Sequence, residues 1–288
     1  MVACMTSLLL LLLLGDLASA AELQFEMPAV SMYAQRSVLT GGSLVVIGAH
    51  HFGRDANDAI YKSVANVSWS SVLLVEASPI VAAELKTFVA ERNPTPSVPH
   101  NKVKVVNAGV CPGGSDGTSE QSTLPFHTLK YADGLAWWQG QIGSFNKQHL
   151  YNHFKPLLKS AKPKNRYTWA NLEALLTETP VACYTLLGLL RAHGIAKVGM
   201  LLLDTEGLDC GILANQEWGS DEWCDRRPTG IVFEFRHCPK EALANASTAL
   251  SERSGKCRHA GKEHYKRVAA NSENEFWALE RKREMNAR

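Results

Sequence analysis

The chain has 288 residues, of which 45% are hydrophobic and 20% are charged, and its formal net charge is +2. This length and composition suit a globular protein that buries a sizeable core. The net charge argues neither for nor against a nucleic-acid partner, but the sequence has no long basic run among aromatic residues, so we expect no nucleic-acid partner.

The N-terminus has the pattern of a secretory signal peptide. Residues 7–14 are a leucine-rich run too short to span a bilayer, and Ala18-Ser19-Ala20 is the small-residue pattern at which signal peptidase cleaves. We therefore predict that residues 1–20 are removed and that the protein resides in the lumen of the endoplasmic reticulum or Golgi, or outside the cell. No later apolar run approaches the length of a membrane span, so we expect no span after cleavage.

The cysteine pattern agrees with a secretory route. Six cysteines follow the predicted signal peptide: Cys111, Cys183, Cys210, Cys224, Cys238 and Cys257. An even number of cysteines in an oxidising compartment predicts up to three disulfides, and every pairing remains open at this stage. Two glycosylation sequons begin at Asn66 and Asn245.

Apolar runs and helical patterns alternate after residues 21–42, a mixed segment that precedes the first core strand. The expected elements are a strand at 44–47, a helix at 55–65 with Asp55 or Asn57 as its N-cap, a strand at 71–76, a helix at 80–92 and a strand at 102–106. Continuous rather than alternating apolar strands indicate parallel strands buried on both faces. The order predicts an α/β fold with a doubly wound, mostly parallel sheet.

The second half of the chain begins with a less regular stretch. Residues 111–168 contain glycine-rich turns and aromatic residues, and we expect them to form a loop-rich insertion over the carboxyl edge of the sheet. Further elements are expected as strands at 181–185, 198–204 and 229–234 and a helix at 186–193. We expect residues 43–250 to form the main domain and residues 251–288 a basic tail that ends in a helix over 274–283.

Polar residues and glycines follow three of the apolar strands. Gly48 follows the first strand, Glu76 ends the second, and Asp204 and Glu206 follow the most apolar one. In an open parallel sheet, a ligand lies outside the carboxyl ends of the strands. There a glycine turn lets the backbone approach the ligand closely, and an acid accepts hydrogen bonds from ribose hydroxyls. Because the first loop has Gly48 and Gly53 without the G-x-G-x-x-G pattern, the sequence disfavours a nicotinamide cofactor.

Four segments carry these residues in a recognisable order. They are Val46-Ile47-Gly48-Ala49-His50-His51-Phe52-Gly53, Leu73-Leu74-Val75-Glu76-Ala77-Ser78-Pro79, Val105-Val106-Asn107-Ala108-Gly109-Val110 and Leu201-Leu202-Leu203-Asp204-Thr205-Glu206-Gly207. Together they resemble the FkbM family of S-adenosylmethionine-dependent methyltransferases. The similarity continues through residues 142–145 and 231–237, so it covers about residues 43–238. It implies a Rossmann-like class I methyltransferase fold over residues 43–250.

The resemblance also implies roles for the matching residues. It implies that Gly48, Ala49 and His50 stand at the methionine end of S-adenosylmethionine, that Glu76 holds its ribose, and that Asn107 and Ala108 flank its adenine. Gly53, in the same loop as Gly48, is also expected to bind the cofactor. Asp204 and Glu206 would face the reacting end. The activity that it implies is methyl transfer to oxygen, commonly of a sugar or natural-product hydroxyl.

Methyl transfer to a hydroxyl is helped by a general base that removes the hydroxyl proton. We predict His51, Asp204 and Glu206 as catalytic candidates, with His51 first because an unperturbed histidine titrates near neutral pH. The alternatives are structural: the two acids orient their loop or cap the next helix, and His51 bonds to backbone. We predict no metal site, since no C-x-x-C pair is present; a metal held by Asp204, Glu206 and a histidine is the alternative.

The sequence therefore predicts an S-adenosylmethionine-dependent O-methyltransferase that acts on a hydroxyl of a glycan or small metabolite in the secretory pathway. Two positions depart from the family pattern. Val46 stands where the family usually has an acid, and the loop has His50 in place of asparagine, with one extra residue before Gly53. These departures motivate one alternative, a catalytically inactive secreted binding module with a methyltransferase-like fold. A lumenal oxidoreductase with a Rossmann fold is the second alternative.

Overall fold

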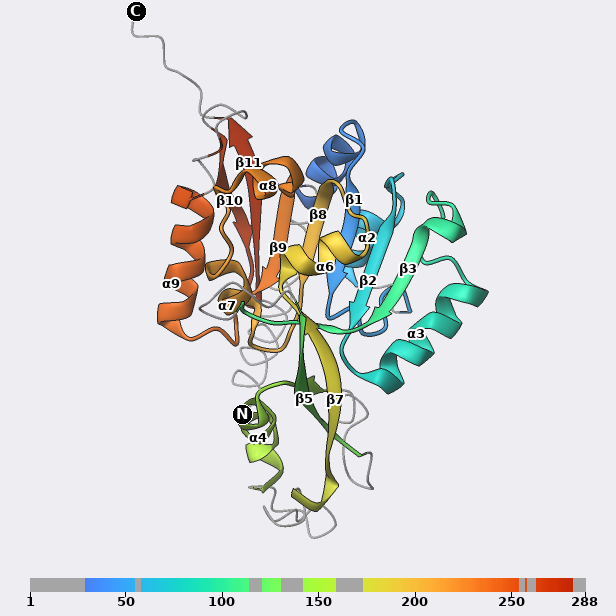
Figure 1. The fold of residues 1–288 in the computed structure, drawn as a ribbon, viewed down its shortest axis with the longest axis vertical. Helices are drawn as coiled ribbons and strands as arrows, with labels where there is room; N and C mark the ends of the chain where they lie inside the picture. Colours follow the sequence, from blue (N-terminus) through green and yellow to red (C-terminus); the bar gives the residue numbers. More distant parts are fainter. Residues whose placement is uncertain are drawn as a thin grey trace, which may run out of the picture.

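The computed structural model describes residues 29–54, 58–113, 121–130, 142–158, 173–253, 257 and 263–281. These residues form a larger sheet flanked by helices and a smaller sheet that projects from it (Figure 1). The predicted signal peptide and the helix caps expected at Asp55 or Asn57 lie outside the described residues. Among those described, no helix has both the length and the apolar character needed to cross a bilayer.

The larger sheet has seven strands in the order β10-β11-β9-β8-β1-β2-β3. Their bounds are β1 Ser43–Ile47, β2 Val72–Glu76, β3 Val103–Asn107, β8 Val198–Leu203, β9 Gly230–Glu234, β10 Glu263–Ala270 and β11 Asn274–Arg281. Neighbours from β3 to β9 pair in parallel, whereas β11 is antiparallel to both β9 and β10. The predicted α/β fold with a mostly parallel sheet is confirmed.

Alternating side chains of the buried strands pack against helices on opposite faces of this sheet. On β1, Leu44 and Val46 join one apolar cluster, and Val45 and Ile47 join the other. The first cluster packs under residues 29–38, α2 (Ala59–Ala65) and α3 (Pro79–Glu91). The second packs under α6 (Leu186–Ala192), α7 (Asp209–Ala214) and α9 (Lys240–Thr248), with α8 (Asp221–Arg226) beside them. Burial on both faces explains why these strands are continuously apolar in the sequence.

The helices begin where capping side chains are available. Asp58 caps α2 by accepting a hydrogen bond from the backbone N–H of Tyr61, so the cap lies one residue beyond the predicted Asn57. Ser78 caps α3 by accepting from the N–H of Val81, and Pro79 occupies the first helical position. These caps fix the start of each helix directly after a strand of the sheet.

The smaller sheet changes the interpretation of residues 111–168. It has the order β4-β7-β5-β6, with bounds β4 Gly109–Val110, β5 Gln121–Leu129, β6 Gly143–Ser144 and β7 Leu176–Tyr184. The expected loop-rich insertion thus contains β5, β6 and helix α4 (Lys147–Leu158), and β5 forms a long antiparallel pair with β7, which lies beyond the predicted bounds. Together these elements extend away from the larger sheet (Figure 1). The predicted strand at 181–185 was too short because β5 supplies a distant pairing partner along all of β7.

The C-terminal helix predicted over 274–283 is wrong. Residues 274–281 form β11, which pairs with β9 and β10 and completes the sheet. Phe276 packs on one face of the sheet and Trp277 on the other, which is the period-two pattern of a strand. Part of the expected basic tail is therefore core.

Three disulfides use all six cysteines that follow the predicted signal peptide. The pairs are Cys111–Cys183, Cys210–Cys238 and Cys224–Cys257, with Cα–Cα distances of 5.9, 5.9 and 5.5 Å. The predicted number of disulfides is confirmed, and the structure selects the pairing. Such bonds are compatible with an extracellular or secretory-pathway protein.

Candidate functional site

A cavity of about 900 Å³ lies at the carboxyl ends of the central strands. The connections that follow β1 and β8 lead to strands on opposite sides, since β1 is followed by β2 and β8 by β9. This is the point at which an open α/β sheet binds ligands. Ile47 and Leu203, the last residues of β1 and β8, both line the cavity.

The first glycine turn requires glycine at residue 48. Gly48 has φ of +75°, and a Cβ there would lie 1.7 Å from the carbonyl oxygen of Asp204. The turn is held by hydrogen bonds from the N–H groups of Gly48 and Ala49 to the carbonyl oxygen of Val75, both 2.9 Å long. The backbones after β1 and β8 therefore approach each other as closely as a residue without a side chain permits.

Glu76 supports the glycine turn from the end of β2. Its carboxylate accepts hydrogen bonds from the N–H of His50 at 2.8 Å and from the N–H of Ser78 at 2.7 Å. Burial raises its pKa, and these backbone hydrogen bonds oppose the rise. Because a carboxylate has about four acceptor positions, Glu76 retains capacity for a ligand in the cavity that it lines.

Most residues predicted to bind the cofactor line this one cavity. They are Gly48, Ala49, His50, Gly53, Glu76 and Ala108. Asn107 does not line it, because its side-chain amide donates hydrogen bonds to the carbonyl oxygens of Glu76 and Ala77. The role that the structure gives Asn107 is to join the ends of β2 and β3.

The three predicted catalytic residues also line the cavity, but they are not equivalent. Nδ1 of His51 lies 3.2 Å from a guanidinium nitrogen of Arg54. A guanidinium only donates, so Nδ1 must accept, and the lone pair that a general base would use is already engaged. Burial and the charge of Arg54 lower the pKa of His51. His51 is therefore a poorer base than the sequence predicts.

Asp204 and Glu206 are held by a third acid, Asp209 at the start of α7. The fully buried Asp209 carboxylate accepts hydrogen bonds from the N–H and hydroxyl of Thr205, the latter at 2.7 Å. Asp204 faces the cavity, but the protein around it and the charges of Asp209 and Glu206 raise its pKa. Glu206 has φ of +52°, in the left-handed region that few residues other than glycine adopt.

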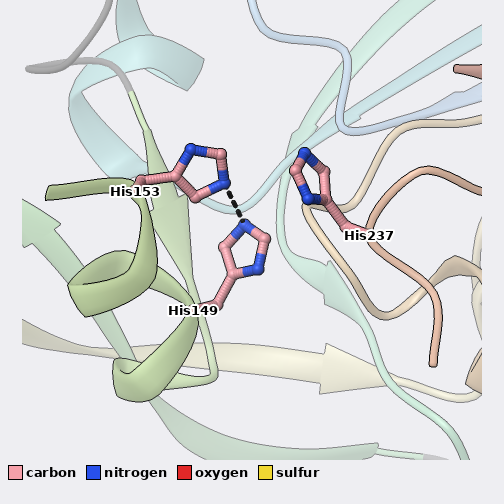
Figure 2. A group of neighbouring side chains, drawn as sticks. All are labelled: His149, His153 and His237. Atoms are coloured by element: carbon pink, nitrogen blue, oxygen red, sulfur yellow. Dashed lines mark hydrogen bonds between the residues drawn. The ribbon is translucent and has the colours of Figure 1, made fainter. Parts of the chain in front are cut away.

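Three histidines meet beside Glu206, and the sequence analysis did not predict them. His149 and His153 lie one turn apart on α4, and His237 faces them from the loop after β9 (Figure 2). Nε2 of His149 lies 3.1 Å from Oε2 of Glu206 and 2.9 Å from Nε2 of His153. The only sequence signal was the i, i+4 spacing of two histidines, whose helix was not predicted.

Glu234, at the end of β9, extends this group of side chains. Its Oε1 lies 3.4 Å from Nε2 of His237, and its buried Oε2 has no hydrogen-bond partner among the described residues. Burial and the neighbouring carboxylates of Asp204 and Glu206 raise the pKa of Glu234 to about 9. We call His149, His153, His237, Glu206 and Glu234 the histidine–carboxylate cluster. His153 and Glu206 are the two members that line the cavity.

The comparisons with known proteins are sparse. No protein-family model matches the sequence, and no curated protein matches it. Among solved structures, the chain is similar to the crystal structure of methyltransferase FkbM from Methylobacillus flagellatus KT, with 10% sequence identity and a TM-score of 0.40. The match covers 86% of this chain and 48% of that one, so the chain spans about half the length of that protein. A similarity at this level assigns no family.

Proposed function

We propose that this protein is an S-adenosylmethionine-dependent methyltransferase that transfers a methyl group to a hydroxyl of a glycan or small metabolite. One observation carries the proposal. The glycine turn at Gly48, the carboxylate of Glu76 and the loop of Asp204 and Glu206 come from three separate strands and line a single cavity at the switch point of the sheet.

The strand order distinguishes this sheet from that of a dinucleotide-dependent oxidoreductase. From β3 to β9 the sheet follows the dinucleotide-binding order, but β11 is inserted antiparallel between β9 and β10, where the dinucleotide-binding sheet continues directly to a sixth parallel strand. The absence of G-x-G-x-x-G in the first loop also disfavours the oxidoreductase.

The residues around the cavity fit the proposed cofactor. The volume of the cavity lies within the range of small-molecule sites, and the backbone at Gly48 permits a ligand to approach closely. Glu76 would hold the ribose, and the Glu206 carboxylate would provide negative charge near a cationic sulfonium. Burial and the neighbouring His51 lower the pKa of His50 to about 4, so the imidazole closest to the turn is neutral and does not repel that charge.

S-adenosylmethionine supplies an electrophilic methyl group on a positively charged sulfur. In the transfer, an O–C bond forms, the C–S bond breaks, and the hydroxyl proton must leave to a base or to water. Positioning two bound reactants contributes roughly 7–11 kcal/mol to such a displacement. Asp204 is the best-placed proton acceptor of the three candidates, because it faces the cavity with a raised pKa and His51 is engaged by Arg54.

The insertion supplies the wall where an acceptor substrate would bind. Phe126 from β5 lines the cavity together with Ile142 and Phe145 near β6. The rings of Phe126 and Phe145 pack with centroids 4.9 Å apart. Apolar and aromatic surfaces of this kind bind the faces of sugar rings and small metabolites.

Residence in the secretory pathway is supported by the predicted signal peptide, the three disulfides and the exposure of Asn66 and Asn245 in the two sequons.

Calorimetry of the disulfide-bonded protein with S-adenosylmethionine tests this proposal. We expect saturable binding that Glu76→Gln weakens at least tenfold, since an amide nitrogen would face the N–H of His50 or Ser78. Glu84→Gln is the matched control, because Glu84 is exposed and lies outside the cavity. Binding of a nicotinamide cofactor instead would favour the oxidoreductase. Binding of S-adenosylmethionine without transfer to any hydroxyl acceptor would favour the inactive binding module.

A further inference from the structure

We propose that the histidine–carboxylate cluster is a binding site for one divalent transition-metal ion, with His149, His153, His237 and Glu206 as its ligands. The three imidazoles present nitrogen atoms that lie within 4.8 Å of one another, and Glu206, Glu234 and His237 form a second such group. Zinc is the ion that fits these donors best. Binding of the ion does not depend on the proposed methyl transfer.

The spacing of the donor atoms is that of a coordination sphere. Nε2 of His153 lies 2.9 Å from Nε2 of His149 and 3.6 Å from Oε2 of Glu206, and the third separation is 3.1 Å. Zinc–ligand bonds of about 2.0–2.1 Å at tetrahedral angles place neighbouring donor atoms about 3.3 Å apart. All three separations lie within about 0.4 Å of that value. A single ion at their centre would contact all three atoms at bonding distance.

Hydrogen bonding satisfies these three atoms only in part. Nε2 of His149 carries at most one proton, and both Oε2 of Glu206 and Nε2 of His153 lie close to it, at 3.1 and 2.9 Å. That proton can serve both neighbours only as a bifurcated hydrogen bond. If His149 instead accepts from His153, its nitrogen presents a lone pair to the Glu206 carboxylate. A cation satisfies the lone pairs of both nitrogens and of the carboxylate at once.

Acidic side chains around the cluster suit a cation. Asp204, Glu206 and Asp209 follow β8, Glu234 ends β9, and Oε2 of Glu234 is buried without a hydrogen-bond partner in the described part of the chain. The guanidinium of Arg236, on the same loop as His237, forms an ion pair with Glu273. A divalent ion would offset the charge of the Glu206 carboxylate, and Glu234 is placed to orient His237 as a ligand.

The fold holds the ligands from three directions. The i, i+4 spacing places His149 and His153 on one face of α4, which the insertion brings over the end of the larger sheet (Figures 1 and 2). Gly207, with φ of +98°, lets the loop of Glu206 approach His149, because a Cβ there would lie 3.2 Å from its Nδ1. The ring centroids of the three histidines lie 4.5 to 5.0 Å apart.

The donor set selects the class of ion. Magnesium and calcium prefer oxygen ligands, whereas imidazole nitrogens suit zinc and its transition-metal neighbours. Because His153 and Glu206 line the cavity, a fifth ligand that expands the coordination of the ion would approach from it. The role of the ion rests on the proposed function. It would bind the oxygen of the acceptor hydroxyl and lower the pKa of that hydroxyl before the oxygen attacks the methyl carbon.

Metal content and titration test the site without any measurement of activity. We expect the purified protein to contain one equivalent of metal, and the chelator-treated protein to bind Zn²⁺ with a 1:1 stoichiometry and Mg²⁺ far more weakly. Co²⁺ in place of Zn²⁺ should give the visible absorption of a four- or five-coordinate nitrogen and oxygen site. His153→Ala should weaken Zn²⁺ binding by more than about 100-fold, beyond the loss typical of an outer-shell change.

The controls separate the site from the fold and from the proposed function. His264→Ala, on β10 outside the cluster, should bind Zn²⁺ as the unchanged protein does. If His153→Ala fails to fold, Glu206→Gln keeps the side-chain shape and should still weaken binding. Absence of saturable Zn²⁺ binding, or equal binding by His153→Ala, would overturn the proposal. S-adenosylmethionine binding by the chelated protein is measured separately, so failure of either proposal leaves the other intact.

Discussion

Cys210 and Cys238 are joined by a disulfide that brings the start of α7 to the loop after β9. Cys210 directly follows Asp209, whose carboxylate holds the loop of Glu206, and Cys238 directly follows His237. This covalent bond therefore ties the loop that carries His237 to the helix that holds the loop of Glu206. Its position connects the disulfide framework with the proposed metal site.

Replacing both cysteines of this pair by serine should weaken metal binding as well as stability. The loop that it closes predicts a loss of about 3–4 kcal/mol in the free energy of unfolding. The matched control is Cys224→Ser with Cys257→Ser, since the two pairs have sequence separations of 28 and 33 residues. We expect similar losses of stability from urea unfolding but a loss of Zn²⁺ affinity only for the first pair. Equal affinities in the two variants would contradict this assignment.

Gly48→Ala should abolish the cavity or the fold. The new Cβ would collide with the Asp204 carbonyl in a left-handed backbone conformation, so we expect a loss above about 3 kcal/mol in the free energy of unfolding. Gly194 is the matched control, because it has φ of +67° and no atom within 4 Å of a new Cβ. Gly194→Ala should cost only about 1 kcal/mol. Chemical denaturation of both variants checks the difference.

His50 should make the protein less stable in mild acid. Its folded pKa of about 4 lies below the ordinary value of 6.5, mainly because of burial. The unfolded chain therefore binds a proton that the folded chain excludes, so stability is complete above pH 6.5 and is lost as the pH falls toward 4. Partial exposure of the ring limits the expected loss to about 1–3 kcal/mol.

His50→Asn isolates this effect. Asparagine tolerates the positive φ of +41° at this position and does not titrate. The difference in unfolding free energy between the variant and the unchanged protein should therefore shift in favour of the variant between pH 6.5 and 4. A pH-independent difference would mean that the histidine is not excluded from protonation in the folded chain.

Trp277→Ala tests whether the C-terminal segment belongs to the core. The indole is 6% exposed and its N–H donates to the Glu275 carboxylate at 2.8 Å. Truncation should cost about 3–5 kcal/mol, whereas Val268→Ala on the neighbouring β10, where the side chain is 37% exposed, should change stability by less than about 0.5 kcal/mol. Thermal unfolding of the two variants distinguishes a core strand from a dispensable tail.

The sequence by itself determined the parallel core and most of the cavity. Strands buried on both faces are continuously apolar, so β1, β2 and β8 were recognisable from composition alone. The carboxyl ends of parallel strands meet at one edge of a sheet, and this rule alone predicts that Gly48, Glu76 and Asp204 lie together. Local sequence patterns suffice to predict these strands because each strand is continuously apolar over its own length.

Only the tertiary structure decided the rest, because those features depend on partners distant in the chain. β11 is a strand because β9 and β10 supply its hydrogen bonds, and the cysteines pair across segments that no spacing rule connects. His149 and His237 lie far apart in the sequence and meet only when the insertion folds over the sheet. The proposed metal site is thus a product of packing between elements, which a linear pattern does not encode.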